Sequence, residues 1–318
     1  MKLIKSLSRG LLIFLIIISI GALIYVMQWE EEPAGVKIPE KEIGKTEKPK
    51  AILPKVEGDK TALKTPVVPK TAPGKEKEKA VVSKIEKIPL PLHRIAIIID
   101  DIGNDLRPVR ELLKINAQIT FAILPLCSHT RDAAEMVHKA GRETLLHLPM
   151  EPTSYPREKP GNGALFTDMN DRELLFQLDK NLASVPHISG VNNHMGSKFM
   201  ADEDKLMLIF DMLKKKNLFF IDSRTTTDSK AEIASDKVGL PMASRRIFLD
   251  NSRSYKEISK ILVEVAEDKG DAPVIIIGHP YPETIRAIKD ATGILRAKGV
   301  TIVPVSQLIK DNVHRRSS

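Results

Sequence analysis

Residues 95–103 read Ile-Ala-Ile-Ile-Ile-Asp-Asp-Ile-Gly: five apolar residues, two adjacent aspartates, and a glycine two positions later. A short apolar run that ends abruptly in charge is typical of a strand buried on both faces of a parallel sheet. Seven similar runs follow along the chain, at 119–124, 144–146, 188–191, 218–221, 247–249, 274–277 and 300–303. Amphipathic stretches of helical length separate the runs, so the region from residue 93 onward is predicted to consist of β/α units.

The number of runs predicts the architecture. Seven or eight β/α units within residues 93–318 fit an α/β fold of the distorted or incomplete (β/α) barrel kind better than an open nucleotide-binding sheet. No Gly-x-Gly-x-x-Gly follows the first run and no phosphate loop occurs, so no nucleotide cofactor is expected. Asn170 with Glu173, and Ser254 with Glu257, have the spacing of capping boxes and indicate two helix starts.

Residues 1–30 are predicted to be a membrane anchor. The segment 10–29 carries no charge and is long enough, as a helix, to cross the hydrocarbon core of a bilayer. Three basic residues precede it and acidic residues follow it, which predicts a single-pass protein of the bacterial inner membrane with a cytoplasmic N-terminus. The rest of the chain is then periplasmic. A cleaved signal peptide is the alternative, and it exports the same residues.

A tether and a globular domain follow the anchor. Residues 31–92 contain 9 of the 21 prolines and no aromatic residue, a composition that predicts a disordered linker. Of the net charge of +8, +6 belongs to residues 1–92, and the domain at 93–318 keeps only +2. That domain lacks the concentrated positive charge that phosphate binding requires, so no nucleic-acid partner is expected.

Polar residues follow six of the eight runs. They are Asp100 and Asp101, His147, Asn192 to His194, Asp222 to Arg224, Asp250 with Asn251, and His279. In a β/α barrel the carboxyl ends of the strands meet on one face, and active sites lie there. Each residue alone has an ordinary structural explanation, as a helix cap or a hydrogen-bonded core residue. The whole set on one face favours an active site.

Two adjacent carboxylates in a confined site are costly unless something separates their charges. A divalent metal ion bound by one of them does so and leaves the other free to act as a base. His147 and His194 complete a three-ligand site with an open position, a layout that zinc uses in catalysis. Zinc lowers the pKa of bound water and polarises carbonyl groups. A further histidine, His279, is then placed to protonate a leaving group.

These residues resemble the motifs of the polysaccharide deacetylases, and residues 93–310 resemble the divergent branch of that family. The matching segments are 99–103, 147–152, 192–197, 222–224 and 278–280. The resemblance implies a distorted barrel of the NodB-like type and metal-dependent removal of acetyl groups from an N-acetylated envelope or exported polysaccharide. It also implies that Asp100 is the general base, Asp101 a metal ligand and His279 the general acid.

The chain departs from the main family at two motifs. The main family takes both metal-binding histidines from one His-x-x-x-His motif, but the fourth residue after His147 is Glu151. His194 is therefore expected to be the second histidine, with Glu151 as a ligand or a support. The main family's Arg-x-Pro motif on the fourth strand is also missing from this chain. Arg224 is expected to replace the arginine of that motif in tuning the catalytic aspartate. Asn193, Asp222 and Asp250 are expected to support the site.

Two other functions remain open from the sequence. The same metal centre would suit an amidase acting on peptidoglycan peptides. A catalytically inactive, tethered module that binds glycans is the other alternative, although only 4% of residues are aromatic. Tyr155 and Tyr281 are the few aromatic residues predicted near the site that could stack on a sugar. The remaining histidines, at 93, 129, 138, 187 and 314, are interpreted as structural.

Overall fold

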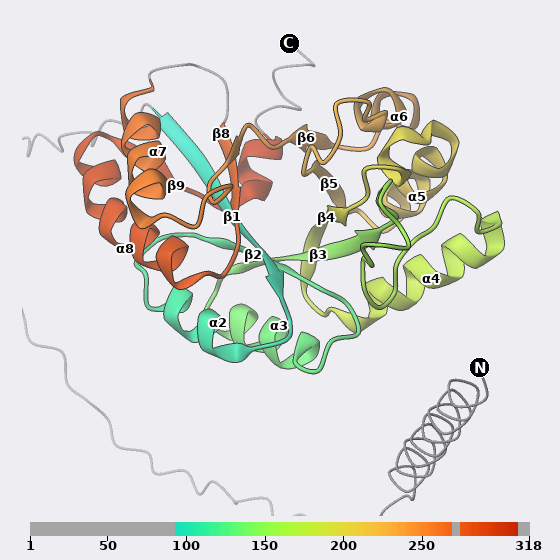
Figure 1. Ribbon diagram of the computed structural model, residues 1–318, viewed down its shortest axis with the longest axis horizontal. Helices are drawn as coiled ribbons and strands as arrows, with labels where there is room; N and C mark the ends of the chain where they lie inside the picture. Colours follow the sequence, from blue (N-terminus) through green and yellow to red (C-terminus); the bar gives the residue numbers. More distant parts are fainter. Residues whose placement is uncertain (1–92, 269–273, 311–318) are drawn as a thin grey trace, which may run out of the picture. The chain divides into compact units, whose positions relative to one another are not determined.

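The computed structural model describes residues 93–268 and 274–310 (Figure 1). The membrane anchor and tether predicted within residues 1–92 lie outside the described residues. In the described part of the chain, no helix has both the length and the apolar character needed to cross a bilayer.

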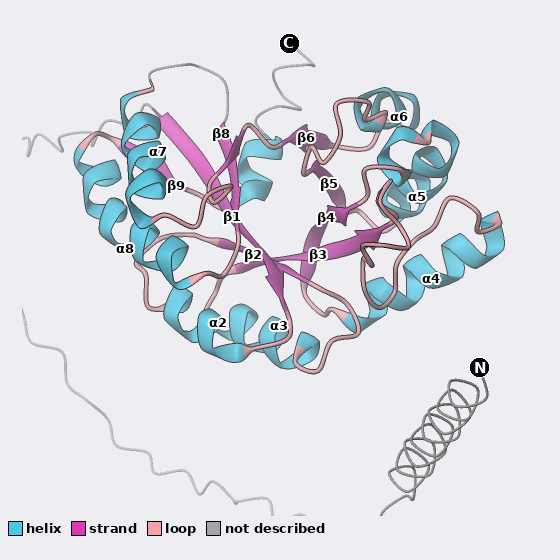
Figure 2. Ribbon diagram, in the orientation of Figure 1, coloured by secondary structure: helices cyan, strands magenta, loops and turns pink. Residues whose placement is uncertain are grey.

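The described chain alternates strands and helices, with the strands gathered at the centre and the helices around them (Figure 2). The strands are β1 (His93–Ile102), β2 (Thr120–Ile123), β3 (Glu143–Met150), β4 (Ile188–Met195), β5 (Phe219–Asp222), β6 (Met242–Ser244), β7 (Ile247–Phe248), β8 (Val274–Gly278) and β9 (Val300–Ile302). The helices are α2 (Leu106–Leu113), α3 (Thr130–Lys139), α4 (Asp171–Ser184), α5 (Glu203–Lys215), α6 (Ala231–Val238), α7 (Tyr255–Glu267) and α8 (Pro282–Ala297), with a 3₁₀ turn η1 (Phe199–Ala201).

All the strand pairs are parallel, in the order β6-β5-β4-β3-β2-β1-β8-β7, and β9 pairs with the start of β1. The predicted α/β fold with a curled, incomplete barrel is confirmed, and each of the eight apolar runs forms a strand. The sequence prediction missed β6, whose three residues are only partly buried and form no apolar run. The expected capping box at Asn170 and Glu173 is present.

The two edges of the sheet meet at a seam between β6 and β7. These strands lie at opposite ends of the strand order, yet only Arg245 and Arg246 separate them in the chain. The Arg245 backbone nitrogen donates to the carbonyl oxygen of Asp222 on β5, and the Arg246 nitrogen donates to Ile275 on β8. The sheet therefore curls far enough for one short segment to bond both edges.

Strand alternation divides the apolar core into two parts. On β1, Ile95, Ile97 and Ile99 pack with the cluster that includes the helices, whereas Ala96 and Ile98 belong to a second cluster. The second cluster also takes alternate residues of β2, β3, β5 and β8 and the apolar side chains of residues 303–309. Because successive side chains of a strand point to opposite faces, this second cluster fills the inside of the curled sheet.

A glycine on the inner face makes room for an aromatic ring. Gly190 on β4 pairs with Phe219 on β5, and a Cβ atom added to Gly190 would lie 2.5 Å from the Phe219 ring. We expect Gly190→Ala to lower the free energy of unfolding by about 1–3 kcal/mol through overpacking. Denaturant unfolding of both forms measures this loss. In a Phe219→Leu background the same substitution should cost clearly less, and equal costs in the two backgrounds would contradict the packing explanation.

Candidate metal centre and active site

Strand alternation places the polar side chains above the inner apolar cluster. Asp100 is two residues beyond Ile98 on β1, and His147 is two residues beyond Leu145 on β3. His279 likewise follows Ile277 on β8 by two residues. Since side chains two residues apart on a strand share a face, these three side chains continue the inner face of the sheet at its carboxyl end.

Asp101 reaches the same site because the backbone departs from regular strand geometry. In a straight strand its side chain would point away from that of Asp100. The register between β1 and β2 shifts between Ile99 and Ile102, and Asp101 has a φ angle of 57°, in the left-handed region. Asp and Asn tolerate this conformation better than most residues, and such strain is concentrated at functional sites. The bulge brings two adjacent carboxylates to one site.

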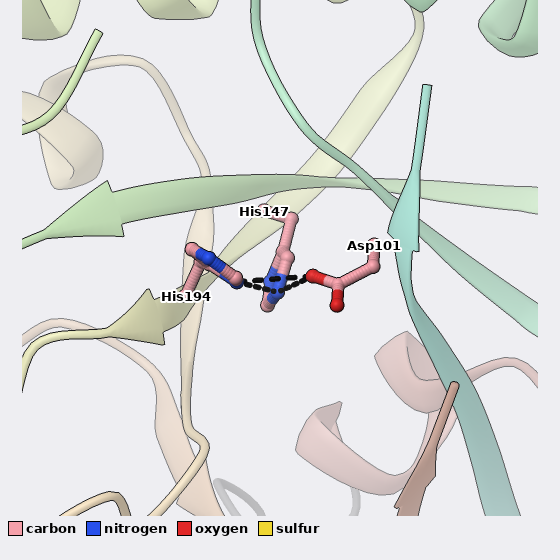
Figure 3. Close-up of side chains that lie close together, drawn as sticks. All are labelled: Asp101, His147 and His194. Carbon is pink, nitrogen blue, oxygen red and sulfur yellow. Dashed lines mark hydrogen bonds and ion pairs between the residues drawn. The ribbon is translucent and has the colours of Figure 1, made fainter. Parts of the chain in front are cut away.

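Asp101, His147 and His194 form a compact triangle of possible metal ligands (Figure 3). Asp101 Oδ1 lies 3.3 Å from His147 Nε2 and 3.0 Å from His194 Nδ1. The two nitrogens are 3.1 Å apart. For metal–ligand bonds of about 2.0–2.1 Å, neighbouring ligands lie about 2.9 Å apart at right angles and about 3.4 Å apart in a tetrahedron. All three separations therefore fit ligands that share one cation.

The donor chemistry also fits a cation. Asp101 Oδ1 is shielded from solvent, and the groups that approach it are the imidazole nitrogens of His147 and His194. Burial alone would raise the pKa of Asp101, but the rings of His147 and His194 outweigh it and hold that pKa well below its usual range. For His147 burial opposes protonation, but Asp100 and Asp101 raise its pKa overall. The site thus favours a positive charge at the centre of the triangle.

Asn192 connects this triangle to Asp100. The Asn192 side-chain nitrogen donates to Asp100 Oδ1 at 2.8 Å, and its oxygen lies 3.0 Å from His147 Nδ1. An ionised carboxylate only accepts hydrogen bonds, so the amide nitrogen must face Asp100 and the amide oxygen must face the histidine. His147 therefore carries its proton on Nδ1, which leaves the Nε2 lone pair directed at the triangle.

Asp100 lies beside the triangle and is 3% exposed. Its Oδ2 is 3.6 Å from His147 Nε2. Burial raises the pKa of Asp100, although the charge of His147 and the hydrogen bond from Asn192 act in the opposite direction. A carboxylate with a raised pKa is a better proton acceptor than an exposed aspartate. Asp100 is the carboxylate of the pair that is not part of the triangle.

His279 approaches the triangle from β8 and is oriented by Asp250. Its Nδ1 lies 2.9 Å from Asp250 Oδ1, and its Nε2 lies 3.7 Å from Asp101 Oδ2. Asp250 Oδ2 also accepts from the His279 backbone nitrogen and from the Thr284 hydroxyl. Burial works against protonation of His279, but Asp250 and the two other aspartates raise its pKa overall. A proton on His279 Nε2 would face the triangle.

Glu151 lies outside the triangle, although the sequence left open a role for it as a ligand. Its Oε2 accepts from the Thr167 backbone and hydroxyl, and its Oε1 pairs with Lys198 at 2.8 Å. Its backbone oxygen accepts from the nitrogens of Lys198 and Phe199. Burial would raise the pKa of Glu151, but Lys198 and Thr167 lower it overall. Glu151 therefore holds together the segments that follow β3 and β4.

Asn193 points away from the inner face, as alternation requires. Its side chain bonds the Ser223 nitrogen, the Met195 oxygen and the Thr225 hydroxyl, so it ties β4 to the loop after β5. The sequence interpretation named Asn193 as a supporting residue and passed over Asn192. The position of Asn192, an even number of residues before His194 on one strand, was the signal that could have identified it.

Among the described residues, no hydrogen bond or ion pair links Asp222 or Arg224 to the triangle. Asp222 accepts from the Arg224 backbone nitrogen and the Ser229 hydroxyl, and it organises the loop after β5. Arg224 is exposed. The arginine on which the charges of Asp222 and Asp100 act is Arg245, at the seam, where burial lowers its pKa. Sequence reasoning missed Arg245 because no apolar run precedes it.

Comparison with known proteins gives consistent matches over the described domain. The sequence model of the family described as "Divergent polysaccharide deacetylase" matches residues 97–309. The chain is 32% identical over 227 residues to YibQ, an uncharacterized protein of Escherichia coli (strain K12), covering 70% of this chain and 69% of the relative. It is 33% identical over 202 residues to an uncharacterized protein of Haemophilus influenzae, covering 62% of this chain and 70% of the relative.

A solved structure shares the fold. The crystal structure of the uncharacterized protein ATU2773 from Agrobacterium tumefaciens C58 superimposes with a TM-score of 0.65 at 22% sequence identity. The superposition covers 68% of this chain and 89% of that chain. At this level of identity the likeness concerns the curled parallel sheet and its helices.

We expect the triangle to bind about one divalent ion per chain, as a three-ligand site does. Asp101→Asn, His147→Ala and His194→Ala should each lose the ion, because each removes one of three ligands. Asn tolerates the left-handed backbone at position 101, so that variant should keep its fold. Elemental analysis of the purified proteins measures the bound metal, and circular dichroism checks folding. His138→Ala, which alters a histidine stacked on His187 away from the triangle, is the matched control and should keep the ion.

Asn192 should affect metal affinity through His147. We expect Asn192→Ala to weaken metal binding by about 10–100-fold, because His147 Nδ1 loses its acceptor. Asn192→Asp keeps an acceptor for His147 Nδ1, although it loses the donor to Asp100, and should bind metal more tightly than Asn192→Ala. Competition with a chelator measures both affinities. Equal affinities of the Ala and Asp variants would show that Asn192 does not act through the histidine.

Proposed function

The chain belongs to the divergent polysaccharide deacetylase family, as its motifs predicted, and we propose that it is a metal-dependent deacetylase of an N-acetylated envelope or exported polysaccharide. One observation carries the proposal. A buried carboxylate, Asp100, and an oriented histidine, His279, both lie beside a triangle of ligands that fits a single cation. Metal-dependent amide hydrolysis uses three such parts: a Lewis acid, a base and an acid.

Asp100 has the position of the general base. Asn192 occupies its Oδ1, and its Oδ2 faces the triangle, 3.6 Å from His147 Nε2. From there Oδ2 can take a proton from a water molecule that attacks the acetyl carbonyl carbon. The second carboxylate, Asp101, cannot serve in this way while it holds the ion. The left-handed turn thus gives two chemically identical neighbours different tasks.

His279 has the position of the general acid. Its Nδ1 is held by Asp250, so its Nε2 is directed at the reaction site. After the carbonyl carbon has been attacked, a proton from Nε2 can pass to the nitrogen of the sugar as the carbon–nitrogen bond breaks. The Asp250 carboxylate also fixes the His279 backbone through the main-chain nitrogen. The ring is therefore oriented from two sides before substrate binds.

A divalent cation bound by Asp101, His147 and His194 would polarise the acetyl carbonyl and make water more acidic. Two imidazoles and one carboxylate form a donor set that zinc uses in hydrolytic sites, so zinc is the proposed ion. The location is proposed from the sequence alone. The apolar segment 10–29 and the linker would hold the domain at the outer side of the bacterial inner membrane.

We expect Asp100→Asn to reduce acetate release from acetylated glycans by about 10²–10⁴-fold, because the amide cannot accept the proton. The variant should still bind about one ion per chain, since Asp100 is not a ligand of the triangle. The assay uses the full-length, zinc-loaded protein with chitin oligosaccharides and peptidoglycan strands as substrates. His138→Ala should retain wild-type turnover. An active Asp100→Asn protein would remove Asp100 from the mechanism.

The same assay separates the alternative functions. Turnover of peptide amides, with no acetate released from any glycan, would identify an amidase. Affinity for glycans with no turnover under zinc, cobalt, nickel or manganese would identify an inactive binding module.

A further inference from the structure

Three arginines lie in the three connections that follow β5, β6 and β7, and two of them stack on rings that flank His279. We call Arg224, Arg245 and Arg253 the arginine rim. Arg224 follows β5, Arg245 lies at the seam between β6 and β7, and Arg253 lies in the loop between β7 and α7. No carboxylate among residues 93–268 and 274–310 forms an ion pair with any of the three. Such unpaired cations near the candidate active site require an explanation.

Arg245 connects the rim to His279 through an aromatic ring. Its guanidinium carbon lies 4.8 Å from the centre of the Phe248 ring, and that ring meets the His279 ring edge-on at 5.3 Å. Arg245 Nε and Nη2 donate to the backbone oxygens of Ser223 and Arg224. A guanidinium has five N–H donors, so donors remain for a ligand.

Arg253 forms a similar stack on Tyr281, the second aromatic ring beside His279. Its guanidinium carbon lies 3.9 Å from the centre of the Tyr281 ring, and its Nη2 donates to the Tyr281 hydroxyl. The Tyr281 ring lies 5.6 Å from the His279 ring. Tyr281 was predicted as a platform for a sugar, but an arginine already covers one of its faces. Stacking of this kind orders the guanidinium and leaves its outer edge available.

Arg245 carries a partly buried positive charge that has no ion pair among the described residues. Burial lowers the pKa of Arg245, the charges of Asp222 and Asp100 act to raise it, and the charge of Arg224 acts to lower it to a smaller extent. Arg245 is also half-buried. A partly buried guanidinium without an ion pair is unfavourable, and an anion bound to its free N–H donors would stabilise it.

From this arrangement we infer that the substrate is an anionic glycan, with a carboxylate or phosphate group that binds the arginine rim while the acetylated sugar lies at the triangle. This inference rests on the proposed deacetylase function and specifies its substrate class. A neutral polymer such as chitin would leave the arginines without a counterion. The rim would thus select the substrate by charge, and the Asp101, His147 and His194 triangle would act on its acetyl group.

The competing explanation is that these arginines only fasten loops, since two of them bond backbone or side-chain oxygens of neighbouring segments. Loop fastening predicts losses of stability when an arginine is removed. Charge selection predicts a loss of preference between acidic and neutral ligands. Arg224 and Arg253 are exposed, so their replacement by glutamine should leave the fold intact and separate the two explanations.

Binding is tested in the full-length, zinc-loaded protein carrying Asp100→Asn, so that ligands are not consumed. Calorimetry compares a hyaluronan hexasaccharide, which alternates N-acetylglucosamine and glucuronate, with a chitin hexasaccharide of equal length. N-acetylglucosamine 6-phosphate against N-acetylglucosamine forms the phosphate arm. We expect at least one acidic ligand to bind about tenfold more tightly than its neutral counterpart, the effect of one charge-assisted hydrogen bond.

Arg224→Gln and Arg253→Gln should each reduce this preference several-fold, and added salt should weaken it. The matched control is Arg110→Gln on the exposed face of α2, which should not change it. Equal binding of acidic and neutral ligands by the parent protein, or an equal effect of Arg110→Gln, would overturn the inference. Turnover by the wild-type enzyme is a separate readout. Preferential binding of acidic ligands without acetate release from any glycan would support the arginine rim as an anion site and contradict the deacetylase function.

Discussion

Two adjacent carboxylates, Asp100 and Asp101, face one site because the chain turns into the left-handed region at the second of them. A regular strand would have placed them on opposite faces, with one in the interior and the other among the helices. The turn creates a local excess of negative charge against two imidazole rings. That excess favours a cation, and the separations between Asp101, His147 and His194 match those of shared ligands.

Hydrogen bonds to the neighbouring groups give these side chains separate chemistry. Asn192 bonds Asp100 with one end of its amide and His147 with the other, so a single side chain orients both the proposed base and a possible metal ligand. Asp250 does the same for His279 through its ring and its backbone. Both supports are buried, where hydrogen bonds are electrostatically stronger than in water. The fold itself therefore holds these side chains in place.

The seam of the incomplete barrel determines where Arg245 lies, and this position bears on the proposed function. A closed barrel would have continuous strands where the chain instead crosses from β6 to β7 at Arg245. At this point the guanidinium lies on Phe248, beside the site. A fold that closes imperfectly thereby brings a charged side chain to a position that a regular strand pair would give to an apolar residue. The seam links the architecture to the proposed preference for acidic glycans.

The sequence by itself determined the order of the strands along the chain and the chemistry at their ends. Apolar runs such as 95–99 predict buried strands because only a parallel sheet covered on both faces needs such continuity. The residues Asp101, His147 and His194 were identified because polar groups at strand ends must share one face. The family resemblance assigned Asp100 and His279 their tasks.

Tertiary structure alone decided which partners those residues have. Glu151 and His147 lie four residues apart, yet Glu151 pairs with Lys198, 47 residues away in the sequence. The contacts of Asn192 depend on the register between β3 and β4. The contacts of Arg245 depend on the position of the seam between β6 and β7. A run of apolar residues predicts that a strand exists. It does not predict the strand register, the bulge in β1 or the extent to which the sheet closes, because these arise from packing between segments distant in sequence.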